Sequence, residues 1–521
     1  MVNDEILNYK EKPKFGKIEI LLICCIVFQL IICLMSVHYG DGYFRDELYQ
    51  IALSNHLGWG YVDVPPLAPF LLRIVRSIFG TSLFSLHLLP AIVCAVVIFL
   101  TYRMVKIFGG GFFAGVFALI PITLYSCAYG SLYLYDTFNY FFWSLMIYCL
   151  IKLFLTQNKK YWIYIGIIGG LGLMTKWTIL FLGFGIVSAL IITTDNKHAI
   201  YQKHLYYIQL WIGGLIAVLI FLPYIIWNFI HGFPTLDFLS IYAAHKLIPM
   251  SALYYIKAAI LGTLPFFPIW FLGLYYFLFN SKGKKYRVLG IAFIVIFLLT
   301  VFLHTRTGVI NAFYPVLFAG GAVVLEALLK SKKLIPIKII YILFLICFGL
   351  YVLPTIRPVL TLKTFIKYYG NSGVNVEGHK KGVLPQGYAD RFGWKELTQK
   401  VAKVYNSLPP KQKAETAIYT MDYGEAGAIA LFGKKYGLPN PISGHNQYYI
   451  WGSENYTGKS VIMITLRSKT DLLKYFKSVK LMGRTNNKYC MPYENHLPIW
   501  LCTEPKFKSF KEVWQDFKNY S

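Results

Sequence analysis

An acidic pair, Asp46 and Glu47, follows the first long apolar segment of the chain in the stretch GYFRDELYQIAL. Only 24 of the 521 residues are acidic, against 51 basic ones, so adjacent carboxylates at the edge of an apolar segment are unusual here. Carboxylates remove and hold protons in enzymes, and a membrane-surface setting raises the pKa of a carboxyl group toward neutral values. The pair is therefore the first candidate for chemistry in this sequence.

Other ionisable residues are expected on the same side of the membrane as this pair. They are Asp41, Arg45 and Asp63 in the first outer loop (residues 38–82), together with Asp136, Lys176, His231, His245 and Arg306. A charge at mid-bilayer costs roughly 2.5 kcal/mol or more, so the convergence of charges at the ends of apolar segments favours a site. The alternative is that these residues lie in solvent-exposed loops, where a charge has little energetic cost.

The elements that must position these residues are membrane helices. Hydrophobic residues make up 56% of the chain and aromatic residues 18%. Apolar segments near the ~20 residues needed to cross a bilayer recur along the chain. About eleven of them begin near Ile18, Leu83, Phe112, Phe138, Tyr161, Trp177, Ile208, Ala258, Val288, Val309 and Pro336. This pattern predicts a polytopic α-helical membrane protein embedded in the lipid bilayer.

Basic residues gather in alternate loops, which predicts the orientation of the chain. They lie in the segments 10–17, 103–106, 159–160, 197–203, 282–287 and 330–333. By the positive-inside rule these segments and the N-terminus are expected in the cytoplasm, with the chain in the plasma or inner membrane. The first apolar segment lacks a small-residue cleavage site and is expected to be a retained span. Lipid headgroups and topology account for much of the net charge of +27, so nucleic acid is not an expected partner.

Composition divides the chain into two parts. Residues 1–354 are predicted to form the transmembrane domain and residues 355–521 a small α/β domain, because β-like runs such as KSVIMITLR alternate there with helical runs such as WKELTQKVAKVYNSL. An odd number of spans predicts that this domain is extracytoplasmic. Seven of the nine cysteines lie in apolar segments, whereas Cys490 and Cys502 in the outer domain could form a disulfide or remain free thiols.

The placement of the charges also bears on the class of function. The chain has no G-x-x-x-x-G-K-[ST] phosphate loop, so a nucleotide-driven pump is not expected. Two classes remain: a membrane enzyme that uses an activated lipid-borne substrate, and a secondary transporter or flippase. Transporters carry ionisable residues near the bilayer midplane, often at broken helices. The charges of this chain lie at the ends of spans, which favours the enzyme.

The order of several motifs resembles glycosyltransferase family 39, the polyprenyl-phosphate-sugar-dependent GT-C enzymes related to protein mannosyltransferases and aminoarabinose transferases. The motifs are the acidic pair after the first span, Tyr61-Val-Asp63-Val-Pro65-Pro66-Leu67, Asp136 before a later span, and Leu-Met-Thr-Lys176. The resemblance covers residues 18–353. It implies a GT-C fold and transfer of a sugar, with inversion, from a polyprenyl-phosphate carrier to a lipid, glycan or protein acceptor. Such a donor already has a good leaving group, so the reaction needs a base and cations but no general acid.

The resemblance implies a role for each matching residue. Asp46 matches the first acid of the family's pair and is the expected base. Glu47 would point about 100° away on an amphipathic helix at the membrane, so it is expected to position groups, with a structural role at the helix N-terminus as an equal alternative. Asp136 is expected in the catalytic site, although helix capping would also explain it. Lys176 is the expected phosphate ligand, with snorkelling as the alternative.

Three further residues of the outer face are expected to contact substrate. Arg45 could bind phosphate or lower the pKa of Asp46. Asp63 could orient the acceptor or its own loop, and Arg306 could bind phosphate or a lipid headgroup. The family often has His or another polar residue where this chain has Val64, so any role of that side chain is absent or supplied elsewhere.

The outer domain contributes one further candidate. The segment Ser443–Tyr448 has the polar and aromatic composition of a carbohydrate-contacting loop, with His445 as the candidate acceptor contact. The segment Tyr423–Gly427 could receive an anion at a helix N-terminus, although a structural turn is the commoner explanation. No cofactor or metal ligand set is predicted, and a divalent metal held by a loop histidine and Glu47 is left open. A catalytically silent relative that binds lipid is the third interpretation.

Overall fold

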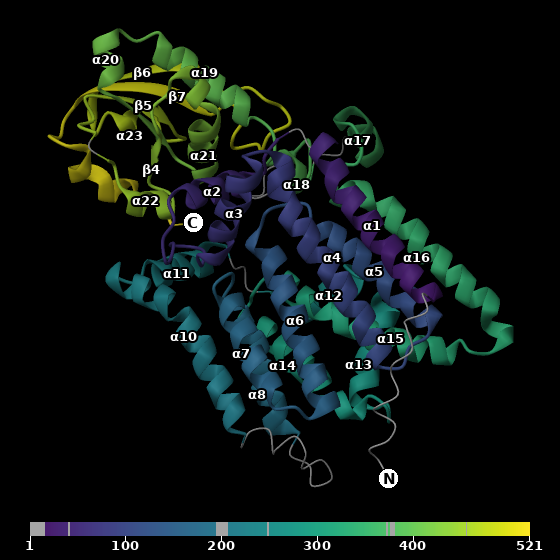
Figure 1. Cartoon of the computed structure of the whole chain (residues 1–521). Helices are drawn as coiled ribbons and strands as arrows, with labels where there is room; N and C mark the ends of the chain where they lie inside the picture. Colours follow the sequence, from purple (N-terminus) through teal and green to yellow (C-terminus); the bar gives the residue numbers. More distant parts are fainter. Residues whose placement is uncertain are drawn as a thin grey trace.

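The computed structural model describes residues 16–39, 42–193, 207–246, 250–370, 374–375, 381–454 and 456–520. It consists of a helical part followed by a domain built on a β-sheet (Figure 1). The predicted outer-loop residue Asp41 lies outside the described residues. The helices of the helical part are α1 Lys17–Tyr39, α2 Arg45–Asn55, α3 Leu67–Phe79, α4 Leu83–Ile107, α5 Phe112–Tyr129, α6 Tyr135–Thr156, α7 Lys160–Leu173, α8 Ile179–Ile192, α10 Ile208–Ile230, α11 Pro234–Lys246, α12 Ala252–Leu261, α13 Phe267–Leu278, α14 Arg287–Phe302, the 3-10 helix η2 Thr307–Phe313, α15 Tyr314–Leu328, α16 Ile335–Ile356 and α17 Leu362–Tyr369.

Within the described ranges, eight helices are long and apolar enough to cross a membrane, and α8, α12 and α13 are shorter apolar helices. The polytopic helical fold is therefore confirmed, while the number of eleven spans stays a prediction. Two predicted spans differ in form. The segment from Tyr161 folds as the 14-residue α7, which ends before the turn that carries Lys176. The segment near Ala258 is divided into α12 and α13, and Pro265, which has no backbone N–H to donate, lies in the turn between them.

Glycines let the membrane helices approach one another closely. A Cβ atom added at Gly166 of α7 would lie 2.1 Å from the carbonyl oxygen of Gly213 in α10. One added at Gly321 of α15 would lie 1.7 Å from the carbonyl oxygen of Ile269 in α13. No side chain fits at these contacts, and small residues are the usual solution for close packing of membrane helices. Helix α7, whose C-terminal end leads into the turn of Lys176, is held against α10 in this way.

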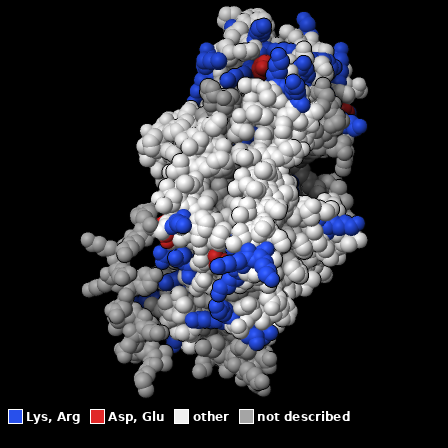
Figure 2. Space-filling model, turned by 90° about the vertical axis from the view of Figure 1, so that its right-hand side faces the viewer, with Lys and Arg blue, Asp and Glu red and all other residues white. Residues whose placement is uncertain are grey.

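Lys and Arg side chains gather toward two ends of the molecule, and a broad uncharged band lies between them (Figure 2). At the end away from the C-terminal domain, Lys285 Nζ lies 3.5 Å from the carbonyl oxygen of Leu155, and Glu326 accepts a hydrogen bond of 2.7 Å from the backbone N–H of Gly111. The basic loop before α14 thus shares one end with the start of α5 and the ends of α6 and α15. The positive-inside pattern predicts this arrangement, and the cytoplasmic location of that end stays a prediction.

The C-terminal domain is built on a five-stranded sheet with the strand order β4-β3-β5-β7-β6. Strand β3 is parallel to β4 and β5, whereas β7 is antiparallel to β5 and β6. A two-stranded antiparallel sheet of β1 and β2 precedes it. The strands are β1 Val374–Asn375, β2 Lys381–Gly382, β3 Thr416–Thr420, β4 Ile442–Ser443, β5 Ser460–Ile464, β6 Phe476–Arg484 and β7 Pro498–Pro505. The predicted α/β domain is therefore present, with a mixed sheet.

Helices cover both faces of this sheet. The helices of this domain are α18 Gln386–Ala389, α19 Trp394–Asn406, α20 Pro410–Ala414, α21 Tyr423–Phe432, α22 Gln447–Trp451, α23 Lys469–Leu472 and the 3-10 helix η6 Phe510–Phe517. One core joins Val401 of α19 to Ile418 of β3, and a second core joins Phe510 of η6 to the opposite face. Cys490 and Cys502 are buried and free, so the two thiols are not bridged in this structure.

Helix α2 joins the two parts of the molecule (Figure 1). Its residue Leu48 belongs to the core of the C-terminal domain, whereas Ile51 belongs to the core of the membrane helices. A Cβ atom added at Gly427 of α21 would lie 2.8 Å from the carbonyl oxygen of Leu48, so α21 lies directly on α2. Residues 47–54 of α2 are buried between the two folded parts. Whether the helix also lies at the membrane surface, as considered from the sequence, stays a prediction.

Candidate active site

The candidate site residues converge where the C-terminal domain covers α2 and the start of α6. Asp46 lies in the first turn of α2 and Asp136 in the first turn of α6. Tyr135, the first residue of α6, packs against the same buried cluster as Tyr423 and Tyr49, whose hydroxyls bind Asp46 and Asp63, and the Lys176 ammonium lies 4.8 Å from the centre of its ring. The structure therefore brings together charges that the sequence distributes over four separate segments.

Asp46 is a partly exposed carboxylate between the two parts of the molecule. Its Oδ1 atom accepts a hydrogen bond of 2.7 Å from the hydroxyl of Tyr423 in α21. The Nε atom of Arg45 lies 3.8 Å from the same oxygen, and the Asp46 side chain is 27% exposed. A carboxylate that is both held and accessible is suited to accept a proton from a substrate.

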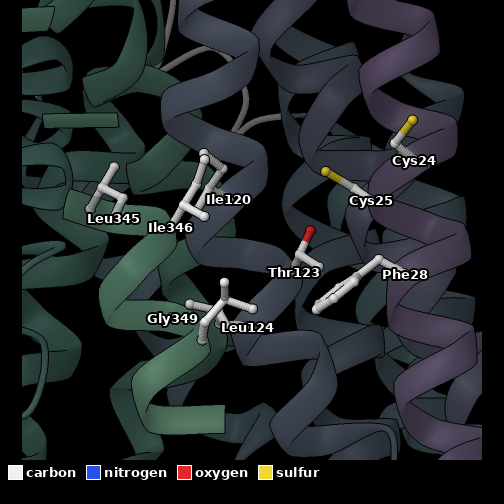
Figure 3. Close-up of a pocket in the computed structure, with 10 residues that line it drawn as sticks. Cys24, Cys25, Phe28, Ile120, Thr123, Leu124, Leu345, Ile346 and Gly349 are labelled. Carbon is white, nitrogen blue, oxygen red and sulfur yellow. The ribbon is translucent and has the colours of Figure 1, made fainter. Parts of the chain in front are cut away.

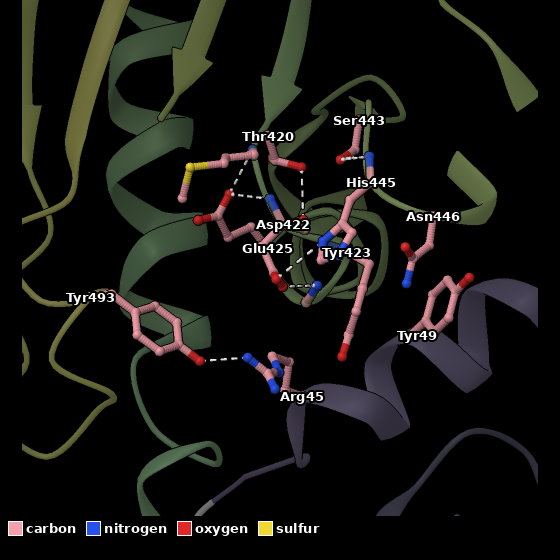
Figure 4. Close-up of polar contacts among 12 residues, drawn as sticks. Arg45, Tyr49, Thr420, Asp422, Tyr423, Glu425, Ser443, His445, Asn446 and Tyr493 are labelled. Carbon is pink, nitrogen blue, oxygen red and sulfur yellow. Dashed lines mark hydrogen bonds and ion pairs between the residues drawn. The ribbon is translucent and has the colours of Figure 1, made fainter. Parts of the chain in front are cut away.

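Arg45 is engaged by the C-terminal domain (Figure 4). Its Nη1 atom donates to the hydroxyl of Tyr493, and its guanidinium lies 5.6 Å from the centre of the Tyr423 ring. Burial alone would lower the pKa of Arg45, but Tyr423 and the acids Asp390 and Asp422 raise it above its ordinary value. The side chain is 12% exposed. Of the two roles that the sequence left open, this environment favours the electrostatic effect on Asp46 over phosphate binding.

Glu47 is fully buried and holds three elements together. Its Oε1 atom lies 2.9 Å from Nε2 of His87 in α4 and accepts from the backbone N–H of Tyr133 at 2.9 Å. Its Oε2 atom accepts from the backbone N–H of Phe44 at 3.0 Å, which caps the start of α2. Burial would raise the pKa of Glu47, but His87 and the backbone donors lower it. The geometry favours the structural role at the helix N-terminus over a catalytic one.

Asp63 connects the first outer loop to the C-terminal domain. Its Oδ1 atom accepts from the hydroxyl of Tyr49 at 2.7 Å, and its Oδ2 atom accepts from the side-chain amide of Asn446 at 3.0 Å. Burial raises the pKa of Asp63 to about 6, although both hydrogen bonds oppose this change. The neighbouring backbone N–H of Val62 donates to Gln447 at 3.1 Å. These contacts support the predicted role of Asp63 in orienting its own loop.

Lys176 and Asp136 form an ion pair through Nζ and Oδ1. The Lys176 ammonium also lies 4.8 Å from the centre of the Tyr135 ring. The ammonium group and the carboxylate both remain partly accessible, with exposed side-chain fractions of 25% and 39%. Lys176 is therefore directed toward the other site residues, which a lysine that merely snorkels to a headgroup does not require.

Arg306 and His231 each lie against an aromatic ring. Arg306 precedes η2 and its guanidinium lies 5.4 Å from the centre of the Tyr242 ring of α11. His231 stacks on Trp227 with a centroid distance of 4.4 Å and its Nδ1 contacts the Trp227 carbonyl oxygen at 2.8 Å. The His245 side chain lies outside the described residues. Within those residues no group of three or more His, Cys, Asp and Glu could hold a metal ion.

His445 is buried inside the C-terminal domain. Its Nδ1 atom accepts from the backbone N–H of Tyr423 at 3.2 Å and lies 3.2 Å from a carboxylate oxygen of Asp422. Its ring stacks beside Tyr423 with a centroid distance of 4.6 Å (Figure 4). The predicted direct contact with the acceptor is not favoured, because only 4% of the residue is exposed. His445 instead supports Tyr423.

A buried acidic cluster lies behind Tyr423. Burial would raise the pKa of Asp422, but His445 and Arg45 lower it to about 2. Burial and neighbouring carboxylates raise the pKa values of Glu425 and Glu494. The two glutamates therefore hold a proton more readily than an ordinary carboxyl group, whereas Asp422 is ionised at neutral pH.

Several residues of the site were not predicted from the sequence as participants. Tyr423, Tyr49 and Asn446 contact Asp46 or Asp63 directly. The strand-to-helix junction at Tyr423 was a signal for the position of that residue, but not for its partner. Tyr49 lies three residues after Asp46, a spacing that places both on one side of a helix.

Two cavities lie apart from these charges. An apolar groove between α1, α5 and α16 is lined by Cys25, Phe28, Thr123 and Gly349 among others (Figure 3). A cavity of about 380 Å³ lies at the junction of the first outer loop with the C-terminal domain and includes Tyr43 and Trp394. Neither is lined by Asp46, Asp136 or Lys176.

Known proteins share both sequence features and fold with this chain. Residues 63–227 match the model of the family described as dolichyl-phosphate-mannose-protein mannosyltransferase. ArnT from Cupriavidus metallidurans in the apo state has a TM-score of 0.57 and 12% sequence identity, covering 92% of this chain and 97% of that chain. ArnT from the same organism bound to undecaprenyl phosphate has the same score and identity, covering 92% and 98%. No curated protein matches the sequence significantly.

A third solved structure is less similar. The archaeal oligosaccharyltransferase AglB from Archaeoglobus fulgidus, in complex with an inhibitory peptide and a dolichol-phosphate, has a TM-score of 0.47 and 14% identity, covering 85% of this chain and 69% of that chain.

The matched region and the shared fold bear on different parts of the prediction. The family model spans Asp63, Asp136 and Lys176, whereas the ArnT structures share their fold with nearly the whole chain. The resemblance to GT-C enzymes inferred from the ordered motifs is confirmed. Residues 63–227 are thus similar to the protein mannosyltransferase family, and the chain is a multi-pass helical membrane protein with the GT-C fold of ArnT.

Proposed function

We propose that this glycosyltransferase moves a sugar from a polyprenyl-phosphate carrier to a lipid, glycan or protein acceptor, with inversion, at the outer face of the cell membrane. The observation that carries the proposal is that Tyr135 packs in one cluster with Tyr423, the partner of Asp46, and lies beside the ion pair of Asp136 and Lys176. The lipid phosphate as carrier is supported by the name of the matching family and by the undecaprenyl phosphate bound to ArnT.

Asp46 acts as the general base in the proposed reaction. The acceptor group gives its proton to the Asp46 carboxylate while its heavy atom forms a bond to the anomeric carbon of the donor. On the opposite side of that carbon, the bond to the phosphate oxygen breaks, and polyprenyl phosphate leaves with the electron pair. One displacement of this kind inverts the anomeric centre. The partial exposure of Asp46 supports this assignment, whereas the complete burial of Glu47 speaks against the neighbouring acid.

Lys176 stabilises the departing phosphate in this proposal. Its ammonium group is partly exposed and ends beside Asp136 and Tyr135. Cations that contact the leaving phosphate lower the transition-state energy, because negative charge develops on that group. Asp136 holds the ammonium group near the site when no donor is present. Arg306, with its guanidinium over the Tyr242 ring, is a second cation available to the phosphate or to a lipid headgroup.

The test is transfer in detergent solution, where no membrane separates two compartments. A detergent extract of envelopes from a deletion strain supplies donor and acceptor, and mass spectrometry detects envelope molecules that gain the mass of one sugar. The wild-type protein should form such a product and Asp46→Asn should not. Asp471→Asn, which alters a surface carboxylate paired with Lys474, should retain full transfer. Full transfer by Asp46→Asn would exclude Asp46 as the base.

The same assay separates the enzyme from a flippase or transporter of lipid-linked sugars. An enzyme makes product without compartments, whereas a transporter has no measurable output in detergent. A product-free wild-type reaction, together with sugar-lipid movement across reconstituted vesicles, would favour the transporter.

A further inference from the structure

The hydroxyl of Tyr423 is the contact by which the C-terminal domain reaches the candidate base. Tyr423 Oη donates to Asp46 Oδ1 at 2.7 Å, although the two residues are 377 positions apart in the chain. The contact exists only because α21 packs on α2, where Gly427 allows the backbone of Leu48 to approach closely. The geometry of Asp46 thus depends on the domain that covers it.

The Tyr423 side chain is held from several directions. Its ring stacks on Tyr49 with a centroid distance of 4.5 Å and lies beside His445 with a centroid distance of 4.6 Å. Its backbone N–H donates to His445 Nδ1 at 3.2 Å. Asp422 caps the same helix through a 2.6 Å hydrogen bond from the backbone N–H of Gly424. The ring of Tyr423 lies between its neighbours Tyr49 and His445 (Figure 4), which keeps its hydroxyl in one place. The hydrogen bond to Asp46 therefore has a defined direction.

We propose that Tyr423 is a positioning residue for the reaction, through which the C-terminal domain orients the Asp46 carboxylate and favours its ionised form. The inference rests on the proposed function of Asp46 as the base. A hydrogen bond donated to a carboxylate stabilises the charged state and fixes one oxygen, which leaves the direction of proton uptake defined. Tyr423 acts through Asp46 and does not itself take part in bond making.

Other charged and titratable groups around Asp46 also influence its ionisation. Arg45 approaches Asp46 from the same helix, Tyr423 from α21 and Tyr135 from α6. Asp422 and His445 lie behind Tyr423 and contact each other. None of these groups changes when only the Tyr423 hydroxyl is removed, so a Tyr423→Phe variant isolates the hydrogen bond.

Tyr448 provides a matched control. It is buried and its ring lies 6.3 Å from that of Tyr49, in the same aromatic cluster as Tyr423. Its hydroxyl has no hydrogen-bond partner among the described residues. Tyr448→Phe therefore removes a phenol oxygen from the same cluster without removing a bond to Asp46.

The experiment compares pH–rate profiles of the full-length wild-type protein, Tyr423→Phe, Tyr448→Phe and Asp46→Asn in the detergent transfer assay. Loss of one hydrogen bond to a charged group is expected to lower kcat of Tyr423→Phe roughly tenfold to a hundredfold at pH 7. The acid limb of its profile should move to higher pH, while the KM for donor stays unchanged. Tyr448→Phe should keep the wild-type rate and profile. Unfolding temperatures of the variants close to the wild-type value would show that the change is not a loss of fold.

Two outcomes would overturn the inference, and they differ in what else they affect. In the first outcome Asp46→Asn is inactive, but Tyr423→Phe keeps the wild-type rate and acid limb, or Tyr448→Phe loses as much activity as Tyr423→Phe. The role of Tyr423 is then wrong, and the proposed function stands. If Asp46→Asn is fully active, the assignment of the base fails and the inference fails with it.

Discussion

Lys176 and Asp136 form an ion pair that joins the turn after α7 to the first turn of α6. The two residues are 40 positions apart, and both side chains remain partly open to solvent. A partly exposed pair of this kind is only marginally stabilising, so an incoming phosphate can compete for the ammonium group at little cost. The pair therefore has the properties expected of a phosphate-binding lysine that a carboxylate holds while no phosphate is bound.

Lys176→Ala is expected to weaken the binding of undecaprenyl phosphate, because it removes the ammonium group that would contact the phosphate. A charge-assisted hydrogen bond of this type corresponds to a loss of roughly tenfold to a hundredfold in affinity. Binding can be measured by the displacement of a fluorescent lipid phosphate from purified protein in detergent. Lys160→Ala removes an exposed lysine at the other end of α7 and should leave the affinity unchanged. Equal affinities for Lys176→Ala and wild type would rule out the phosphate role.

Asp136→Asn is expected to have the opposite effect on binding from Lys176→Ala. The change removes the negative charge beside the lysine, so the phosphate no longer competes with a carboxylate and should bind at least as tightly as in the wild type. Transfer should still slow, because the ammonium group is no longer held in place. The measurements are the same displacement assay and the detergent transfer assay. Weaker binding by Asp136→Asn would mean that Asp136 contributes to the donor site directly.

Glu47→Gln is expected to destabilise the protein by about 2–3 kcal/mol, because Glu47 is a buried carboxylate with partners on three elements. A glutamine has one acceptor oxygen, so either the N–H of Phe44 or the N–H of Tyr133 would face an amide NH2 group. Thermal unfolding in detergent measures the effect, and Asp46→Asn, which changes a partly exposed neighbour, should alter the unfolding temperature much less. Wild-type stability of Glu47→Gln together with lost transfer would instead indicate a catalytic role.

Part of the candidate site could be predicted from the sequence. Charges are rare in the apolar part of this chain, so Asp46, Asp136 and Lys176 could be recognised as site candidates, and their order supported the family. The membrane fold followed from the length of the apolar segments. The sequence assigned the base to Asp46 and left Glu47 between a positioning and a structural role. The contacts of Glu47 with α4 and with Tyr133, and that of Asp46 with Tyr423, could not be predicted, because they join residues far apart in the chain.

The burial of some residues could not be predicted for the same physical reason. The sequence of α2 is compatible with a helix on a membrane surface, and only the packing of α21 reveals that the helix is buried. His445 lies in a segment with the composition of a sugar-contacting loop. It is buried against Asp422 and Tyr423, which lie more than twenty positions earlier in the chain. Local patterns describe which residues are polar, whereas long-range packing decides which of them remain accessible.

Asp63 should make the stability of the protein depend on pH. Burial raises its pKa in the folded protein to about 6, whereas an unfolded chain releases this proton near pH ~4. The folded state therefore binds the proton more tightly, and its stability falls as pH rises from about 4 to about 6 and then stays constant with respect to this group. Asp63→Asn removes the titration, so the variant should gain about 1–2 kcal/mol relative to wild type across this window.

The measurement is the difference in unfolding temperature between Asp63→Asn and wild type in detergent at several pH values from 4.5 to 8. The difference should become more favourable to the variant up to pH ~6 and then remain level. Using the difference cancels the titration of Glu425 and Glu494, which is common to both proteins. The surface variant Asp471→Asn should show a level difference throughout, because the hydrogen bonds from Ser468 and Lys474 keep the pKa of Asp471 near 2. A level difference for Asp63→Asn as well would mean that the folded protein does not hold a proton on Asp63, and that its contacts with Tyr49 and Asn446 outweigh its burial.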